Sequence, residues 1–136
     1  MRLDFSRYAL ALSIDNQIIF ESTQSRLAPL VECIRKFRGT IHGCVLYDKV
    51  VGMAAARLII YSGFISSVHA GTCSRPALQI LSQFGIGVNY DLLVDVILDK
   101  TGSGPCPMET LALEITDGGE LYKMLLNPKL QIPNPK

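Results

Sequence analysis

The stretch from Gly39 to Arg75, GTIHGCVLYDKVVGMAAARLIIYSGFISSVHAGTCSR, decides the fold of this chain. It contains two apolar, β-branched runs at residues 40–47 and 64–70, with a helical pattern between them at residues 49–61. Two strands joined by a helix form a parallel pair with a right-handed crossover, because a tight turn cannot join parallel neighbours. The stretch therefore predicts an α/β fold in which ligands bind beyond the carboxyl ends of the strands.

Residues at the ends of these two strands are the first candidates for a site. Asp48 and Lys49 follow the first predicted strand, and Ser74 and Arg75 open the helix that follows the second. The starts of two adjacent helices would point unpaired N–H groups and positive dipole ends into one cleft, where Lys49 and Arg75 add positive charge. This arrangement predicts a site for a nucleotide-like or phosphorylated small molecule, with Asp48 capping its helix or holding a hydroxyl group. In the alternative, Asp48 and Ser74 are N-caps that contribute about 1 kcal/mol each and bind no ligand.

The flanking sequence continues the alternation of strands and helices. Apolar runs at residues 8–14 and 17–21 are separated by Asp15-Asn16, a pair that tolerates positive φ in a tight hairpin turn. The remaining pattern predicts, in order, a helix after Ser25, a helix at residues 74–84, a strand at 87–91, a helix at 92–98, a strand at 111–115 and a helix at 118–126.

Composition limits the kinds of partner. The chain has 136 residues and a net charge of +1, from 13 basic and 12 acidic residues, so no global field attracts nucleic acid or an acidic membrane. It contains no run of eighteen apolar residues that would span a bilayer. The hydrophobic fraction is 49% against 18% charged, which predicts that part of the surface lies against another copy in a homo-oligomer.

The cysteines and the chain ends indicate a cytoplasmic protein of one domain. Cys33, Cys44, Cys73 and Cys106 are widely spaced, with no C-x-x-C, which is typical of reduced thiols and gives no metal or disulfide pattern. No signal-peptide core is visible near the N-terminus. We expect residues 1–126 to form a single α/β domain and the proline-rich residues 127–136 to form an extended tail.

A second candidate site lies in the polar, glycine-rich segment from residue 99 to residue 110. Its core fits neither the dinucleotide fingerprint, which needs a third glycine after a strand, nor the P-loop, which needs G-K-[ST]. It is therefore a weak candidate for a phosphate-binding loop, with four candidate ligand-binding residues: Thr101, Gly102, Ser103 and Gly104.

Cys106 is the strongest candidate nucleophile. Pro107 suits the first position of a helix, which would place the Cys106 sulfur at the N-cap, where the pKa of a thiol falls from about 8.5 towards neutrality. Glu109 would complete a capping box or act as an acid or base. Cys73 would join Cys106 if the loop folds over the cleft. In the alternative, Cys106 is a small apolar plug under a turn.

Motifs spread along the chain resemble those of a known family. They are Asp48-Lys49-Val50-Val51-Gly52, the alanines at 54–56, Tyr61 with Gly63, Ala70-Gly71, Pro76-Ala77-Leu78 and Thr101-Gly102-x-Gly104-x-Cys106-Pro107-Met108-Glu109. Here the chain is similar to the small bacterial and archaeal proteins grouped as domain of unknown function 1893, over nearly its whole length except the tail. The resemblance implies a cytidine-deaminase-like fold, a three-layer α/β/α sandwich with a mixed sheet of about five strands. It implies no function.

The same resemblance sets a test for zinc. Deaminases of this fold hold zinc with a His or Cys beside a general-base Glu at the start of the second helix, and with P-C-x-x-C at the start of the third. This chain has Asp48-Lys49-Val50 and Cys73-Ser74-Arg75-Pro76 at those places, so at most one of three ligands is present. The resemblance therefore implies a zinc-less relative, with no metal and no cofactor.

Three functions follow from these patterns. The first is a non-catalytic module that binds a small molecule at the starts of the second and third helices. The second is a cysteine-dependent enzyme for sulfur or group transfer that uses Cys106, with Asp48 and Glu109 as further catalytic candidates. The third is a structural homo-oligomer subunit with a vestigial cleft.

Overall fold

The computed structural model describes residues 5, 7–24, 27–99 and 101–126 of the chain. The predicted tail and Ser25, which precedes the first predicted helix, lie outside these residues. The described elements are, in order, β1 (Leu10–Ile14), β2 (Gln17–Ser22), α1 (Ala28–Phe37), β3 (Cys44–Val51), α2 (Met53–Ser62), β4 (Ile65–Ser74), α3 (Arg75–Gln83), β5 (Gly87–Val94), α4 (Pro107–Glu114) and α5 (Gly118–Leu126).

The five strands form one mixed sheet in the order β2-β1-β3-β4-β5. β1 is antiparallel to both β2 and β3, whereas β3, β4 and β5 are parallel to one another. The predicted hairpin joins β1 to β2, with φ of 52° at Asp15 and 65° at Asn16. The predicted parallel crossover joins β3 to β4 through α2. The α/β class and the mixed sheet of five strands are thus confirmed.

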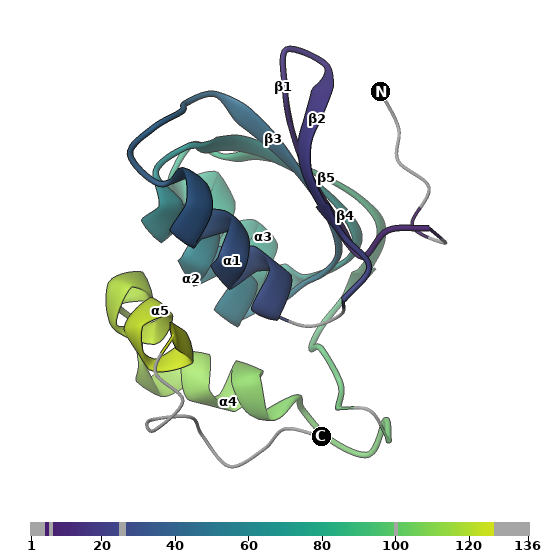
Figure 1. Ribbon diagram of the computed structural model, residues 1–136. Coiled ribbons are helices and arrows are strands. Elements are labelled where there is room, and N and C mark those ends of the chain that lie inside the picture. Colours follow the sequence, from purple (N-terminus) through teal and green to yellow (C-terminus); the bar gives the residue numbers. More distant parts are fainter. Residues whose placement is uncertain (1–4, 6, 25–26, 100, 127–136) are drawn as a thin grey trace.

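The helices lie on one side of this sheet. The chain steps from β3 to β4 to β5 in one direction across the sheet, so two right-handed crossovers place α2 and α3 on the same face. Figure 1 shows α1, α2 and α3 together on that side. Helices α4 and α5 contact α2 and form a further group beyond it. The predicted α/β/α sandwich and the cytidine-deaminase-like arrangement are not confirmed by this architecture.

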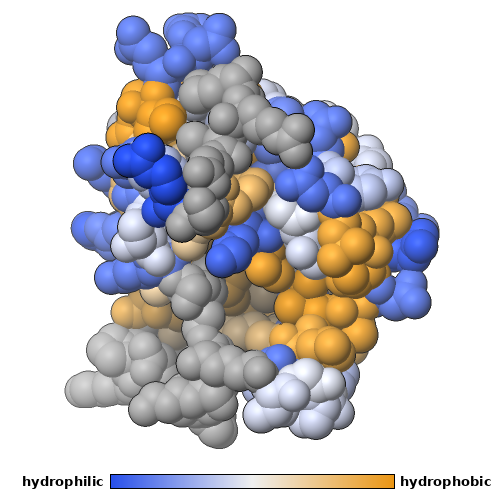
Figure 2. Space-filling view, turned by 90° about the vertical axis from the view of Figure 1, so that its right-hand side faces the viewer, coloured by the Kyte–Doolittle hydropathy of each residue, from blue (hydrophilic) through white to orange (hydrophobic). Residues whose placement is uncertain are grey.

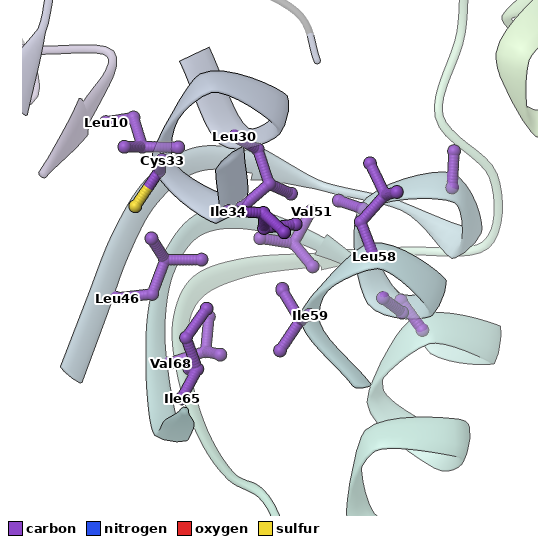
Figure 3. Close-up of a cluster of buried hydrophobic side chains, with 14 of the residues drawn as sticks. Leu10, Leu30, Cys33, Ile34, Leu46, Val51, Leu58, Ile59, Ile65 and Val68 are labelled. Carbon is purple, nitrogen blue, oxygen red and sulfur yellow. The ribbon is translucent and has the colours of Figure 1, made fainter. Parts of the chain in front are cut away.

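The main core lies between the sheet and helices α1 and α2. Figure 3 shows side chains of the strands and of these two helices pointing toward one another. Its labelled residues are Leu10, Leu46, Val51, Ile65 and Val68 from the strands, Leu30, Cys33 and Ile34 from α1, and Leu58 and Ile59 from α2.

Helix α2 is buried on more than one side. It packs on the sheet, on α1 and α3, and on α4 and α5. Its alanines at 54–56 are all buried, and so are Leu58 and Ile59. A helix in this position has little contact with water, which explains why Arg57 is its only charged residue. The Arg57 guanidinium donates hydrogen bonds to the carbonyl oxygens of Ala112 (2.7 Å) and Thr116 (3.2 Å), and so links α2 to the C-terminal part of the domain.

Two of the predicted elements are wrong. Residues 92–94, predicted to be helical, continue β5, because Leu92 and Leu93 pair with Thr72 and Cys73 of β4. Residues 111–114, predicted as part of a strand, belong to α4, which starts with Pro107 at its first turn. Both segments are short apolar runs, in which periodicity alone does not separate helix from strand. Among the described helices, none is long and apolar enough to cross a membrane.

Candidate functional site

A pocket of about 310 Å³ lies where β3 meets the start of α2. One wall comes from Asp48, Lys49 and Val50, and another from the first turn of α2. The segment at residues 97–99 and the start of α4 close it from the other side, so residues more than fifty positions apart share one cavity. Most of the lining is apolar. Figure 2, which shows the right-hand side of Figure 1, has a hollow in its lower half that apolar residues border.

The strand that carries Asp48 runs further than the sequence predicts. Pairing with β4 extends β3 to Val51, and α2 begins only at Met53, with Gly52 as its N-cap. Asp48 and Lys49 therefore belong to the strand and do not open the helix. The prediction that Asp48 caps its helix is wrong, because α2 has no cap from its own N-cap side chain and Asp48 lies four residues before Gly52.

Glu109 of α4 occupies the start of α2. Its two carboxylate oxygens accept hydrogen bonds from the backbone N–H groups of Met53 (2.7 Å) and Ala54 (3.1 Å). These are orphan donors of the helix N-terminus, so the protein's own carboxylate fills the place that the sequence assigned to a ligand anion. Gly52 allows this contact, because a Cβ at that position would overlap the Glu109 carboxylate. The predicted capping box within α4 is not formed, since α4 has no side-chain cap.

Asp48 is a buried acid in the pocket wall, with 7% of its surface exposed. Burial raises the pKa of its carboxyl to about 8, although the backbone N–H groups of Val50 and Lys49 favour the charged form by hydrogen bonding. Among the ion pairs of the described residues, none includes Asp48. Burial therefore favours the neutral form of this carboxyl group.

Cys106 lies at the N-cap of α4, as predicted, and lines the pocket. Its backbone N–H donates to the carbonyl of Ile97 (2.9 Å), which closes the loop between them. Of the four cysteines, it is the one whose side chain is partly exposed. Burial raises the pKa of Cys33 to about 12 and of Cys73 to about 11. Cys73 lies outside the lining of this pocket, so the structure does not bring it together with Cys106 there.

The start of α3 lies apart from this pocket. Ser74 is the N-cap of α3, as the alternative interpretation expected, and its hydroxyl accepts the N–H of Ala77 (3.3 Å). Arg75 binds the carboxylate of Asp95 (2.9 Å), and both side chains are largely exposed. Neither Ser74 nor Arg75 lines the cavity. The two predicted helix entrances therefore do not share one site.

The glycine-rich loop folds around an internal carboxylate. Asp99 accepts hydrogen bonds from the N–H of Thr101 (3.0 Å), the hydroxyl of Thr101 (2.7 Å) and the N–H of Ser103 (3.3 Å). The Thr101 hydroxyl in particular lowers the pKa of the Asp99 carboxyl. The loop donors thus already serve an acid, and Thr101, Gly102, Ser103 and Gly104 do not line the pocket, whereas Asp99 does.

Some lining residues were not among the candidate site residues predicted from the sequence. Ile97, Leu98 and Met108 supply apolar walls, and Gly52 supplies the space for Glu109. The last of these had a signal, since a glycine just before a buried helix indicates a close approach. The described residues hold no group of three His, Cys, Asp or Glu side chains placed to bind a metal ion.

Comparisons with known proteins agree with the architecture. The family described as domain of unknown function (DUF1893) matches residues 2–128. The chain is also similar to a DUF1893 family protein from Thermotoga maritima, whose crystal structure was solved at 2.70 Å resolution, with 33% sequence identity and a TM-score of 0.78. That similarity covers 89% of this chain and 80% of the other. The comparison with curated proteins found no match.

The contact between Glu109 and α2 predicts a stability effect. Replacing Glu109 by alanine leaves the N–H groups of Met53 and Ala54 without their acceptor, so we expect a loss of about 0.5–2 kcal/mol in the free energy of unfolding. Urea denaturation followed by circular dichroism measures it. The matched control is Glu114→Ala, an exposed position in the same helix, with an expected change within about 0.5 kcal/mol. Equal losses in the two variants would contradict the role of Glu109.

Asp48 predicts an unusual pH dependence of stability. Its pKa of about 8 in the folded state lies above the ordinary value of 3.8, so the folded chain holds a proton that the unfolded chain releases between these values. The contribution of this proton to the free energy of unfolding is therefore fully present below about pH 4. It falls as the pH rises to 8, by up to about 1.4 kcal/mol per pH unit.

Urea denaturation at pH 5, 6, 7 and 8 checks this sign. We expect Asp48→Asn to flatten the fall in stability relative to the unaltered chain, because an amide does not titrate. Asp95→Asn, at a largely exposed position, is the control that keeps the slope. The same slope in Asp48→Asn and in the unaltered chain would show that Asp48 releases its proton at the ordinary pH.

Proposed function

Because this chain belongs to the DUF1893 family, whose description states no function, we propose from its own geometry that it binds a small molecule in the pocket at the start of α2. The observation that carries the proposal is the pocket itself. Its volume of about 310 Å³ lies at the lower end of the roughly 300–1,000 Å³ typical of ligand sites. It combines an apolar lining with a few polar side chains, which is the usual composition of such sites.

The polar groups come from separate parts of the chain. Asp48 lies on β3, whereas Cys106 and Glu109 lie at the start of α4. A core that only needed filling would use apolar side chains here, because burying an acid costs free energy unless it is compensated. The burial of Asp48 at a cavity, away from any ion pair of the described residues, is therefore better explained by a ligand than by packing.

Of the two ligand chemistries expected from the sequence, a nucleotide-like ring suits this pocket better than a phosphate. Glu109 occupies the first amides of α2, and a phosphate would have to displace it. Arg75, expected to attract an anion, is bound to Asp95 outside the pocket. Asp99 adds a further acid to the lining. We therefore propose a ligand with a flat, largely apolar body and few negative charges.

Screening of small aromatic fragments tests this function. We expect binding fragments to shift the backbone amide resonances of Ala54, Ala55 and Met108 in a ¹⁵N-labelled sample. Cys106→Phe, which places a ring in the pocket, should abolish these shifts, and Leu98→Lys, at a half-exposed part of the wall, should weaken them. Leu113→Phe, on the exposed side of the same helix as Cys106, is the control that keeps them. Fragments that shift residues elsewhere, or none at all, would contradict the proposal.

One observation favours the second candidate, a cysteine-dependent enzyme. Cys106 is the partly exposed thiol among the four, and it shares the pocket with Asp48 and Glu109. In such an enzyme the Glu109 carboxylate would take the proton of the Cys106 thiol, the thiolate would attack an electrophilic centre of the ligand, and the leaving group would take the proton of the Asp48 carboxyl. The same pocket would then both bind and transform its ligand.

Alkylation of Cys106 decides between a reactive and an ordinary thiol. Since Cys33, Cys44 and Cys73 are buried, slow labelling of those three is uninformative, and the comparison must be with an unfolded reference. We expect iodoacetamide to label Cys106 at pH 6.5 faster than it labels the same peptide in urea-unfolded protein, as measured by mass spectrometry. An equal or slower rate in the folded protein would remove the enzyme from consideration.

The structural homo-oligomer and the cytoplasmic location remain predictions. Large apolar side chains such as Phe84, Leu92 and Leu113 are exposed on the described part of the chain, which supports a contact with a further copy. Light scattering coupled to size-exclusion chromatography gives the subunit number directly.

A further inference from the structure

The carboxyl group of Asp48 points to the chemistry of the ligand. It lies in a pocket wall whose neighbours are mostly apolar, among them Leu27, Ala54 and Met108. The backbone N–H groups of Lys49 and Val50 favour its charged form, but the N–H of Lys49 donates to the carbonyl of Ala9 (2.9 Å). A protonated carboxyl in this position has an O–H group left over, and a buried donor of this kind needs an acceptor.

The charged groups near Asp48 either bind other partners or have side chains that point away from it. Lys49 also lines the pocket, but it is the next residue of β3, and successive side chains of a strand leave on opposite faces of the sheet. The Glu109 carboxylate is bound to the first amides of α2. The titratable and charged side chains around Asp48 come from α1, β3, the segment before α4 and α4 itself: Cys33, Lys49, Asp99, Cys106 and Glu109.

We infer that the pocket takes an uncharged ligand with an apolar ring body, whose carbonyl oxygen or ring nitrogen accepts a hydrogen bond from the carboxylic acid of Asp48. The inference rests on the proposed binding function and specifies its ligand class. A neutral acceptor satisfies the O–H without bringing charge into the apolar cavity, where an unpaired charge is costly. A carboxylate ligand would meet Glu109 and Asp99 at the same walls, and an anion is therefore disfavoured.

Three probes of one shape separate the ligand classes. They are 2-naphthamide, which is neutral, 2-naphthoate, which is an anion, and 2-naphthamidine, which is a cation. We expect 2-naphthamide to bind the full-length protein at least about tenfold more tightly than 2-naphthoate at pH 7, which corresponds to about 1.4 kcal/mol. Titration followed by the amide shifts of Ala54 and Ala55 gives the dissociation constants and confirms the location of the probe.

The pH dependence identifies Asp48 as the donor. With a pKa of about 8 in the free protein, the affinity for 2-naphthamide should be constant from pH 6 to 7 and weaken about tenfold by pH 9, as the acid loses its proton. Asp48→Asn keeps a donor of the same shape, so it should bind 2-naphthamide without this pH dependence. Asp48→Leu should lose most of the affinity. The matched control is Asp95→Asn, a largely exposed acid outside the lining, which should leave the affinity and its pH dependence in place.

The possible outcomes are distinguishable. If none of the three probes shifts the pocket amides, the proposed binding function itself fails. If 2-naphthamidine binds most tightly, and more tightly as the pH rises, Asp48 holds a cation and the inference is overturned while the binding function stands. Preferential binding of 2-naphthoate, or an unchanged pH dependence in Asp48→Asn, would also overturn it.

Discussion

The bond between the Glu109 carboxylate and the first two amides of α2 is the contact on which the site depends. It joins helix α4 to a helix that starts 54 residues earlier in the sequence, and it does so at the edge of the pocket. Because α4 contacts α2 but has no comparable contact with the sheet, this bond sets where the start of α4 lies. Cys106 and Met108 belong to the same turn of chain, so their place in the pocket follows from it. Gly52 is part of the same constraint, since a side chain there would displace the carboxylate.

A carboxylate at a helix N-terminus changes what the pocket can bind. The helix amides and the positive end of the helix dipole would otherwise attract a phosphate or carboxylate ligand. With two of these donors satisfied by Glu109, which also lines the cavity, the attraction of the helix start for an anion is reduced. The opposite wall contains Lys49 and Asp48, and burial favours the neutral form of Asp48. The pocket is thus suited to a ligand of low charge, although its position at the end of a parallel strand is the one that the fold prescribes for binding sites.

Local signals in the sequence were sufficient for the parts of the structure that depend on neighbouring residues. Asp15-Asn16 makes the hairpin, Ser74 caps α3 and Pro107 starts α4, each for a reason that a few residues contain. The parts that failed depend on distant pairing. Residues 48–51 continue β3 because β4 offers them partners, and residues 92–94 extend β5 for the same reason. For the same reason the candidate site was predicted only in part. Asp48, Lys49, Cys106 and Glu109 line one pocket. The hydrogen bonds from Glu109 to α2, however, join residues 56 and 55 positions apart, and no local sequence pattern contains such a contact.

The pocket wall that carries Cys106 is held together by hydrogen bonds within its own segment. The N–H of Cys106 binds the carbonyl of Ile97 (2.9 Å), and the N–H of Asp99 binds the carbonyl of Gly104 (2.8 Å), so the segment between them closes on itself. This closed loop and α4 then meet α2 through the side chain of Glu109. A ligand between the two walls would touch β3 and α2 on one side and this braced unit on the other. Since such a ligand binds only when both walls are in place, its binding free energy adds to the stability of their contact. A ligand that binds only this arrangement would therefore stabilise the docking of α4 on α2, by a free energy that grows with the ligand concentration.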